Sequence, residues 1–177
     1  MKKAICILAM LLLLSSVPTL SQNLEVYGGY GYLAQNFSSG GYASLNGWSA
    51  GTEIGFATSS RFSLATSITG AYGTQKFSGG KQTLHQYSFL AGPRLSQRSG
   101  KLRLFEHAMF GGATLSGRVG DLSDSASGFA LALGGGADVR LSEHFCFRPA
   151  QFDYLLTRFA SRSQNSLRYS SGLTYRF

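Results

Sequence analysis

The sequence predicts an all-β protein, an eight-stranded antiparallel up-and-down transmembrane β-barrel. Residues 167–177 place apolar or aromatic side chains at almost every odd position and polar or small ones at the even positions, ending on Phe177. Seven earlier segments repeat this period of two. In the clearest segments one face is large and apolar, while the other carries glycine, serine, alanine and charge. That distribution is typical of a strand with lipid outside and a wet lumen inside.

The N-terminus predicts export from the cytoplasm. Lys2 and Lys3 precede an apolar run that is too short to span a membrane, and Thr19 and Ser21 are small residues suited to cleavage. We therefore expect residues 1–21 to be a signal peptide and residues 22–177 to form the barrel domain.

Composition excludes several classes of protein. Cleavage would leave Cys146 as a lone cysteine, so an internal disulfide cannot staple the fold. The arginines are dispersed through strand-like segments, whereas nucleic-acid partners are usually bound by a basic run. Histidine and cysteine are too few and too scattered for a zinc site, and no cofactor is expected.

The eight segments share the two-residue period of a strand. In chain order they are Leu24–Tyr32, Trp48–Ala57, Phe62–Gly73, His85–Leu95, about Leu102–Leu115, Phe129–Leu141, Phe145–Leu156 and Leu167–Phe177.

Two of these segments leave their facing open. Glu106 and His107 are adjacent and must point to opposite sides, and a bulge near Phe105 would exchange those sides. Pro149 lacks an N–H donor for strand pairing, so it predicts an irregularity or bulge in the seventh segment.

The connections alternate in predicted length. Those near residues 33–46, 74–83, 116–127 and 157–164 are longer than those near 58–61, 96–101 and 142–144. An even-stranded barrel with both termini in the periplasm has long outer loops and tight inner turns. Aromatic residues near both ends of the segments predict two interfacial girdles.

An eight-stranded barrel is narrow enough to be filled by its own side chains. Buried charges must be paired, so the expected filling is a network of acids and arginines with a structural role. Its candidate members, all predicted to face the lumen, are Glu53, Arg94, Asp138, Arg140, Arg148, Asp153, Arg168 and Arg176.

Three functions compete on this evidence. The favoured one is a plugged barrel with a structural or surface-interaction role, in which outer loops could bind an extracellular ligand. A narrow pore for ions or small solutes is the alternative, because arginines outnumber acids in the predicted lumen. A lipid-modifying enzyme is disfavoured, since Glu106 and His107 on opposite faces cannot form a base and its orienting partner.

Several stretches together resemble the small bacterial outer-membrane β-barrel family that includes the OmpA transmembrane domain and OmpX-like proteins. They are residues 89–94, 108–112, Arg148 with Pro149, Asp153 with Tyr154, and the closing Tyr175-Arg176-Phe177. The resemblance implies a cell outer-membrane location and a monomer surrounded by outer-membrane lipid. It also implies that the barrel-assembly machinery reads Tyr175 and Phe177 as a C-terminal signal.

Overall fold

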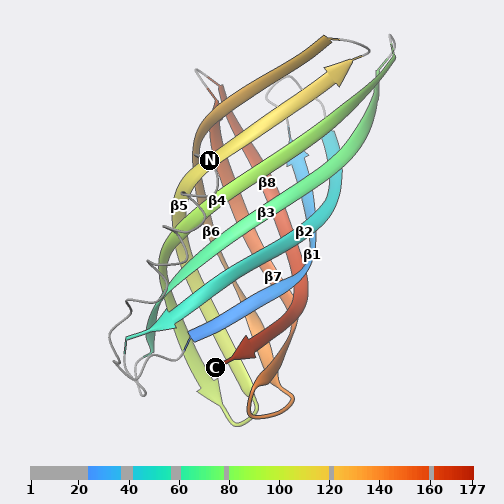
Figure 1. Cartoon of the computed structure of the whole chain (residues 1–177). Coiled ribbons are helices and arrows are strands. Elements are labelled where there is room, and N and C mark those ends of the chain that lie inside the picture. Colours follow the sequence, from blue (N-terminus) through green and yellow to red (C-terminus); the bar gives the residue numbers. More distant parts are fainter. Residues whose placement is uncertain (1–23, 37–41, 57–60, 78–79, 120–121, 160–161) are drawn as a thin grey trace, which may run out of the picture.

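The computed structural model describes residues 24–36, 42–56, 61–77, 80–119, 122–159 and 162–177 (Figure 1). The predicted signal peptide at residues 1–21 lies outside these described residues. The described part contains no helix that is long and apolar enough to cross a membrane.

Eight antiparallel strands close into one barrel in chain order, from β1 next to β2 through to β8 next to β1. This confirms the predicted fold class. The strands are β1 (Leu24–Asn36), β2 (Tyr42–Gly55), β3 (Phe62–Phe77), β4 (Gly80–Ser99), β5 (Leu102–Val119), β6 (Leu122–Arg140), β7 (Phe145–Phe159) and β8 (Arg162–Arg176).

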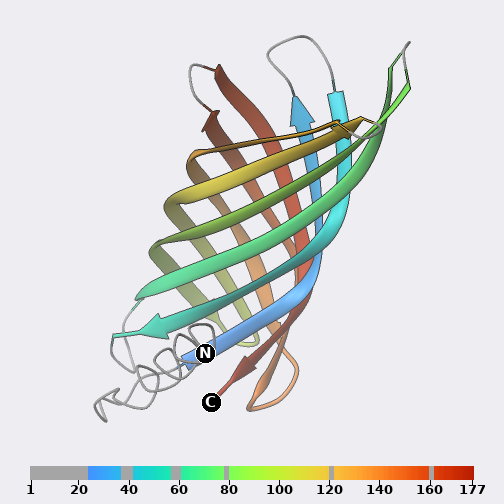
Figure 2. The same cartoon turned by 45° about the horizontal axis from the view of Figure 1, so that its top comes forward.

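The first and last described residues meet at one end of the barrel, where the Phe177 N–H donates to the Leu24 carbonyl at 3.0 Å. The connections from β4 to β5 and from β6 to β7 lie at this same end, which we call the terminal end (Figure 2). The opposite end, where β1, β3, β5 and β7 finish, is the hairpin end. In Figure 1 the β3–β4 and β5–β6 hairpins reach furthest past the rest of the wall.

The predicted long connections at the hairpin end are wrong for most of their length. Only residues 78–79, 120–121 and 160–161 separate the strands of three hairpins, and residues 37–41 separate β1 from β2. The strands continue through the remainder, because polar residues such as Ser125 and Ser127 still pair across to β5. The polar residues in the expected loops therefore show that the strand has passed from lipid into water. They do not show that the strand has ended.

The outer wall has a broad apolar band from the terminal end to an aromatic belt. We define the belt by Tyr30, Trp48, Tyr72, Tyr87 and Phe129. Within the band the outward side chains are exposed leucines, isoleucines and phenylalanines, among them Leu64, Ile68, Phe89, Phe110 and Leu133. A continuous exposed apolar surface of this kind requires lipid as its solvent.

Hydrogen bonds tie the belt together. Trp48 Nε1 donates to the Tyr72 hydroxyl at 3.3 Å, and the hydroxyls of Tyr72 and Tyr87 lie 3.1 Å apart. Aromatic rings with a polar edge prefer the boundary between hydrocarbon and water. The belt therefore marks where the lipid-facing band ends.

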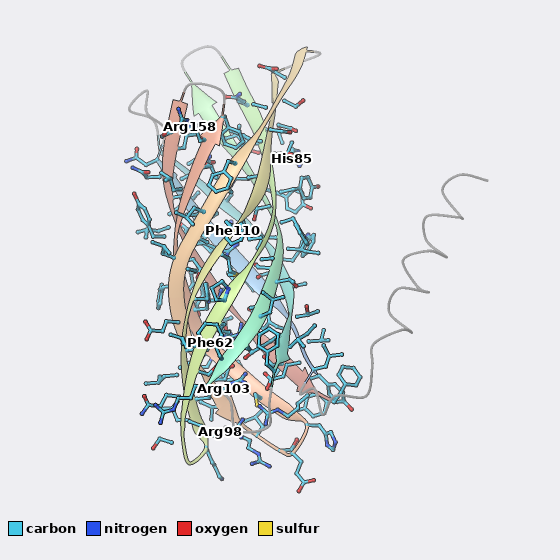
Figure 3. All side chains as sticks on the ribbon, turned by 90° about the vertical axis from the view of Figure 1, so that its left-hand side faces the viewer. Phe62, His85, Arg98, Arg103, Phe110 and Arg158 are labelled. Carbon is cyan, nitrogen blue, oxygen red and sulfur yellow. The ribbon has the colours of Figure 1, made fainter. Side chains whose placement is uncertain are left out.

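Beyond the belt the outward side chains become polar. They include Asn36, Ser44, Asn46, Thr83, Ser125, Ser127, Arg158 and Asn165. In Figure 3, Arg158 and His85 lie toward the hairpin end, while Phe110 and Phe62 lie lower on the wall. The barrel wall thus projects past the lipid boundary, and water is the solvent of the projecting part.

The polarity of the interior changes in the opposite direction to that of the outer wall, and becomes apolar toward the hairpin end. Leu33, Leu45, Leu84 and Phe159 come from stretches at the hairpin side of the belt, and all four side chains are buried. They belong to one buried apolar cluster that continues inward through Leu90, Met109 and Leu155. The expectation of a lumen lined by small and charged residues therefore holds only toward the terminal end, because a wall exposed to water needs an apolar core.

The polarity of the outer wall predicts where charge is tolerated. Leu133→Arg on β6 lies inside the apolar band, so we expect it to lower the free energy of unfolding in lipid vesicles by about 2–4 kcal/mol. Ser127→Arg faces outward on the same strand beyond the belt and should change it by less than about 0.5 kcal/mol. Urea unfolding in vesicles measures both, and equal losses would contradict the assigned boundary.

Candidate functional site

Charged side chains from seven of the strands, together with His107 and Gln151, meet inside the barrel toward its terminal end. We call this group the lumenal network. Its members are Glu25, Glu53, Arg94, Arg103, His107, Asp138, Arg148, Gln151, Asp153, Arg168 and Arg176.

Asp138 on β6 is the centre of the lower part of the network and is 1% exposed. Arg148 Nε donates to its Oδ1 at 2.7 Å, and Arg103 Nη2 donates to its Oδ2 at 2.7 Å. Arg94 approaches the same Oδ2 at 3.8 Å. One carboxylate therefore holds guanidinium groups from β4, β5 and β7 together.

Glu25 and Glu53 neutralise two of these arginines, Arg94 and Arg103, and Glu25 also pairs with Arg176. Arg103 Nη1 donates to Glu25 Oε1 at 2.8 Å, and Arg176 Nε donates to that oxygen at 2.9 Å. Glu53 pairs with Arg94 Nη1 at 2.8 Å and accepts a hydrogen bond from Ser63 Oγ at 2.8 Å. Each arginine of the lower network thus has at least one acidic partner, as burial in a low-dielectric interior requires.

Asp153 forms the upper part of the network. It accepts hydrogen bonds from Arg168 Nε at 2.8 Å and Gln151 Nε2 at 3.0 Å. His107 Nε2 lies 2.7 Å from the remaining oxygen, Oδ1. This carboxylate therefore joins β5, β7 and β8 just below the apolar cluster.

Aromatic rings separate the crowded guanidinium groups. Arg94 lies 3.4 Å from the centre of the Phe105 ring, and Arg148 lies 4.4 Å from the same ring. Arg148 also lies 4.3 Å from the centre of the Tyr27 ring. Attraction between a cation and an aromatic face offsets part of the repulsion between neighbouring arginines.

The predicted irregularity at Pro149 is confirmed, and it explains how β7 supplies both parts of the network. The β7–β8 register shifts by one residue between Arg148 and Gln151. Arg148 faces inward before the shift, and Gln151 and Asp153 face inward after it, although their positions differ in parity. Tyr169 and Ser171 donate to the Pro149 and Arg148 carbonyls at 2.9 and 3.0 Å, which satisfies backbone groups at the bulge.

The structure brings together seven of the predicted lumenal residues and leaves out the eighth. Arg140 has inward parity but is exposed at the end of β6, where its Nε donates to the Ser142 carbonyl at 3.2 Å. The prediction that Arg140 lies in the lumen is therefore wrong, because Arg140 lies at the very end of the strand. The strand reaches water before Arg140, so the side chain has no enclosed lumen to enter.

Sequence reasoning did not assign Glu25 or Arg103 to the network, and it left the facing of His107 open. The β5–β6 register runs unbroken from Leu102 to Val119, so no bulge resets it near Phe105. Strict alternation along β5 therefore points Arg103 and His107 inward and Glu106 outward. This alternation is visible in the sequence, but the sequence alone does not distinguish a regular β5 from one with a bulge near Phe105.

The network leaves little free space. A cavity of about 30 Å³ lies among Glu25, Glu53, Arg94 and Arg148, and one of about 10 Å³ lies beside Arg168 and Leu155. A single water needs a cavity of about 10–15 Å³. Within the described residues, no group of three or more His, Cys, Asp or Glu side chains could hold a metal ion.

Comparison with known proteins agrees with this geometry. The sequence profile of the outer membrane protein beta-barrel domain matches residues 7–177. The chain belongs to this family of outer-membrane barrels. A search of curated proteins found no match.

Solved structures share the fold of this outer-membrane barrel at low sequence identity. Neisserial surface protein A superposes with a TM-score of 0.74 and 13% identity, covering 87% of this chain and 97% of that chain. The attachment invasion locus protein Ail of Yersinia pestis, solved with the heparin analogue sucrose octasulfate, has a TM-score of 0.64, 17% identity and coverage of 88% and 99%. OprG of Pseudomonas aeruginosa has a TM-score of 0.56, 13% identity and coverage of 88% and 95%.

The geometry of the network predicts which charge matters most for stability. Asp138→Asn leaves three buried arginines short of an anion, and we expect a loss of about 3–5 kcal/mol in the free energy of unfolding. Arg140→Gln on the same strand is the matched control and should cost less than about 0.5 kcal/mol, because Arg140 is exposed. Urea unfolding compares the two, and similar losses would contradict the central role of Asp138.

Proposed function

We propose that this outer-membrane barrel is a sealed, monomeric protein that presents its projecting hairpin end for contact with molecules outside the cell. The observation that carries the proposal is the arrangement of two barriers in series. The charged network fills the lumen toward the terminal end. The apolar cluster fills it toward the hairpin end, together with buried neutral polar side chains such as Gln35, Gln86 and Thr157.

Either barrier alone would oppose the passage of ions. An ion at the network would have to displace arginines or acids that are already paired. An ion at the apolar cluster would lose most of its hydration, because only a few neutral side chains such as Gln35 and Gln86 lie beside the cluster. The cavities of about 30 and 10 Å³ hold no more than isolated waters. These features favour a plug over the narrow pore that the excess of arginines first suggested.

The enzyme alternative gains no support from His107 and Asp153, although they are 2.7 Å apart. Both side chains are buried inside the lumen, and their partners are the arginine and glutamine that complete the network. A lipid substrate lies outside the wall and has no route to them through a filled interior. We assign the pair a structural role.

The projecting end is the part of the barrel suited to binding. Its outward residues beyond the belt are polar, and its inner face has a buried core of leucines and Phe159, so it is a rigid surface. Rigid scaffolds commonly carry binding residues at such exposed ends. The heparin analogue in the Ail structure belongs to that protein, and it supports only the general proposal of ligand contact at the cell surface.

The proposed location of the protein rests on two signals in its sequence. We propose that residues 1–21 direct export, and that Tyr175 and Phe177 present the C-terminal signal to the barrel-assembly machinery. Both rings face outward at the terminal end, with centres 4.8 Å apart. They are accessible on the outer wall rather than occupied inside the lumen.

Planar-bilayer recording tests the seal. We expect the folded barrel to show no steady conductance, and we expect Arg94→Gln and Arg168→Gln to remain closed because the apolar cluster is still intact. A steady conductance of the unaltered protein that disappears in either variant would overturn the plug and establish the pore.

Cysteine labelling on intact cells tests the orientation. Ser127→Cys lies outward beyond the belt and should react with a membrane-impermeant maleimide, whereas Glu143→Cys at the terminal end should react only after permeabilisation. Cys146 is buried and gives little background. Labelling of Glu143→Cys on intact cells would reverse the proposed orientation.

A further inference from the structure

One carboxylate lies on the lipid side of the wall. Glu106 is exposed on β5, and its neighbours in the same outward row are Leu104 and Ala108. Its cross-strand partners are Leu95 on β4 and Gly135 on β6. An ionised group within an apolar band is unfavourable unless a cation accompanies it.

Glu106 stands between two open hollows in the outer wall. The first, of about 560 Å³, is bordered by Arg61, Leu95, Gln97 and Leu104 in addition to Glu106. The second, of about 390 Å³, is bordered by Phe62, Pro93, Ala108 and Leu133 with the same carboxylate. Both hollows therefore combine apolar walls with one shared anionic group.

The hollows exist because the surrounding wall is built from small residues. Gly135 lies directly opposite Glu106, and a Cβ at Gly135 would come within 2.5 Å of the Phe105 carbonyl oxygen. The tight approach of β5 and β6 thus keeps this position a glycine. With Ala108 beside it, the wall is recessed where a leucine would otherwise project into lipid.

Arg61 supplies a charge of opposite sign at the edge of the first hollow. Its carbonyl accepts a hydrogen bond from the Ser96 N–H at 2.8 Å, which fixes the backbone of Arg61 against β4. Among the described residues, neither Arg61 nor Glu106 takes part in an ion pair. Glu106 and Arg61 therefore border the same hollow, and neither has an ion-pair partner among the described residues.

We propose that this recess binds the headgroup of a zwitterionic phospholipid with a primary amine, the phosphatidylethanolamine class. Its ammonium group lies against Glu106, its phosphate lies against Arg61, and an acyl chain follows the apolar hollow beside Phe62 and Leu133. Charge complementarity selects this occupant, because both of its charges have a partner at the recess. The site is separate from the plug and does not depend on the proposed surface role.

Other phospholipids match the recess less well. A phosphatidylglycerol headgroup offers a phosphate to Arg61 but no cation to Glu106. A phosphatidylcholine headgroup offers a quaternary ammonium that has no N–H to donate to the carboxylate. We therefore expect the order of affinity to be ethanolamine first, choline second and glycerol last.

Native mass spectrometry of the purified barrel in detergent tests the proposal with these three lipids at matched acyl chains. We expect Glu106→Gln to reduce phosphatidylethanolamine binding at least about fivefold, as the loss of a charge-assisted hydrogen bond predicts. Arg61→Gln should weaken all three lipids, because each has a phosphate. Heat-modifiable mobility on a gel shows that each variant is folded before it is compared.

Two exposed residues at the same end provide matched controls. Glu143→Gln and Arg98→Gln remove the same charges, yet neither residue borders the hollows, so lipid binding should be unchanged. Equal binding of phosphatidylethanolamine by Glu106→Gln and the unaltered protein would overturn the proposal. Equal retention of phosphatidylglycerol and phosphatidylethanolamine by the unaltered protein would also overturn it and reveal only non-selective lipid contact.

Discussion

The change of solvent along the wall is the constraint on which the rest of the structure depends. Each strand leaves lipid at the aromatic belt and continues into water. Where lipid covers the outside, apolar side chains point outward and the lumen takes polar groups, so the acids and arginines must pair with one another. Where water covers the outside, the apolar side chains turn inward and Leu33, Leu45 and Phe159 form a core. One barrel therefore contains two solutions to the burial of apolar surface.

The sequence predicted the barrel because period-two alternation continues along every strand except at the Pro149 bulge of β7. It predicted most of the lumenal charges because they share the small-residue face. It predicted long loops where the strands continue, since polarity beyond the belt is the same in a loop and in a strand surrounded by water. Arg140 shows a second limit: parity gives a side, but only the height along the barrel decides whether the lumen is still enclosed there. Pairing across the lumen, such as His107 with Asp153, depends on strand tilt and stagger that alternation does not contain.

The bulge at Pro149 lets one strand contribute side chains to both the lower and the upper part of the lumenal network. Without the register shift, Arg148 and Asp153 would lie on opposite faces of β7, and one of them would point into lipid. With it, Arg148 reaches Asp138 while Asp153 reaches Arg168 and His107. The proline that cannot take part in strand pairing is thus the point at which a single strand supplies two charged clusters.

The seam between the first and last strands carries an ion pair of its own. Glu25 on β1 lies directly across from Arg176 on β8, and their side chains are bonded inside the lumen. A slip of one residue at this junction would turn one of the two charges toward hydrocarbon. The pair therefore favours the observed register over its nearest neighbours, because only the observed register keeps both charges inside the lumen.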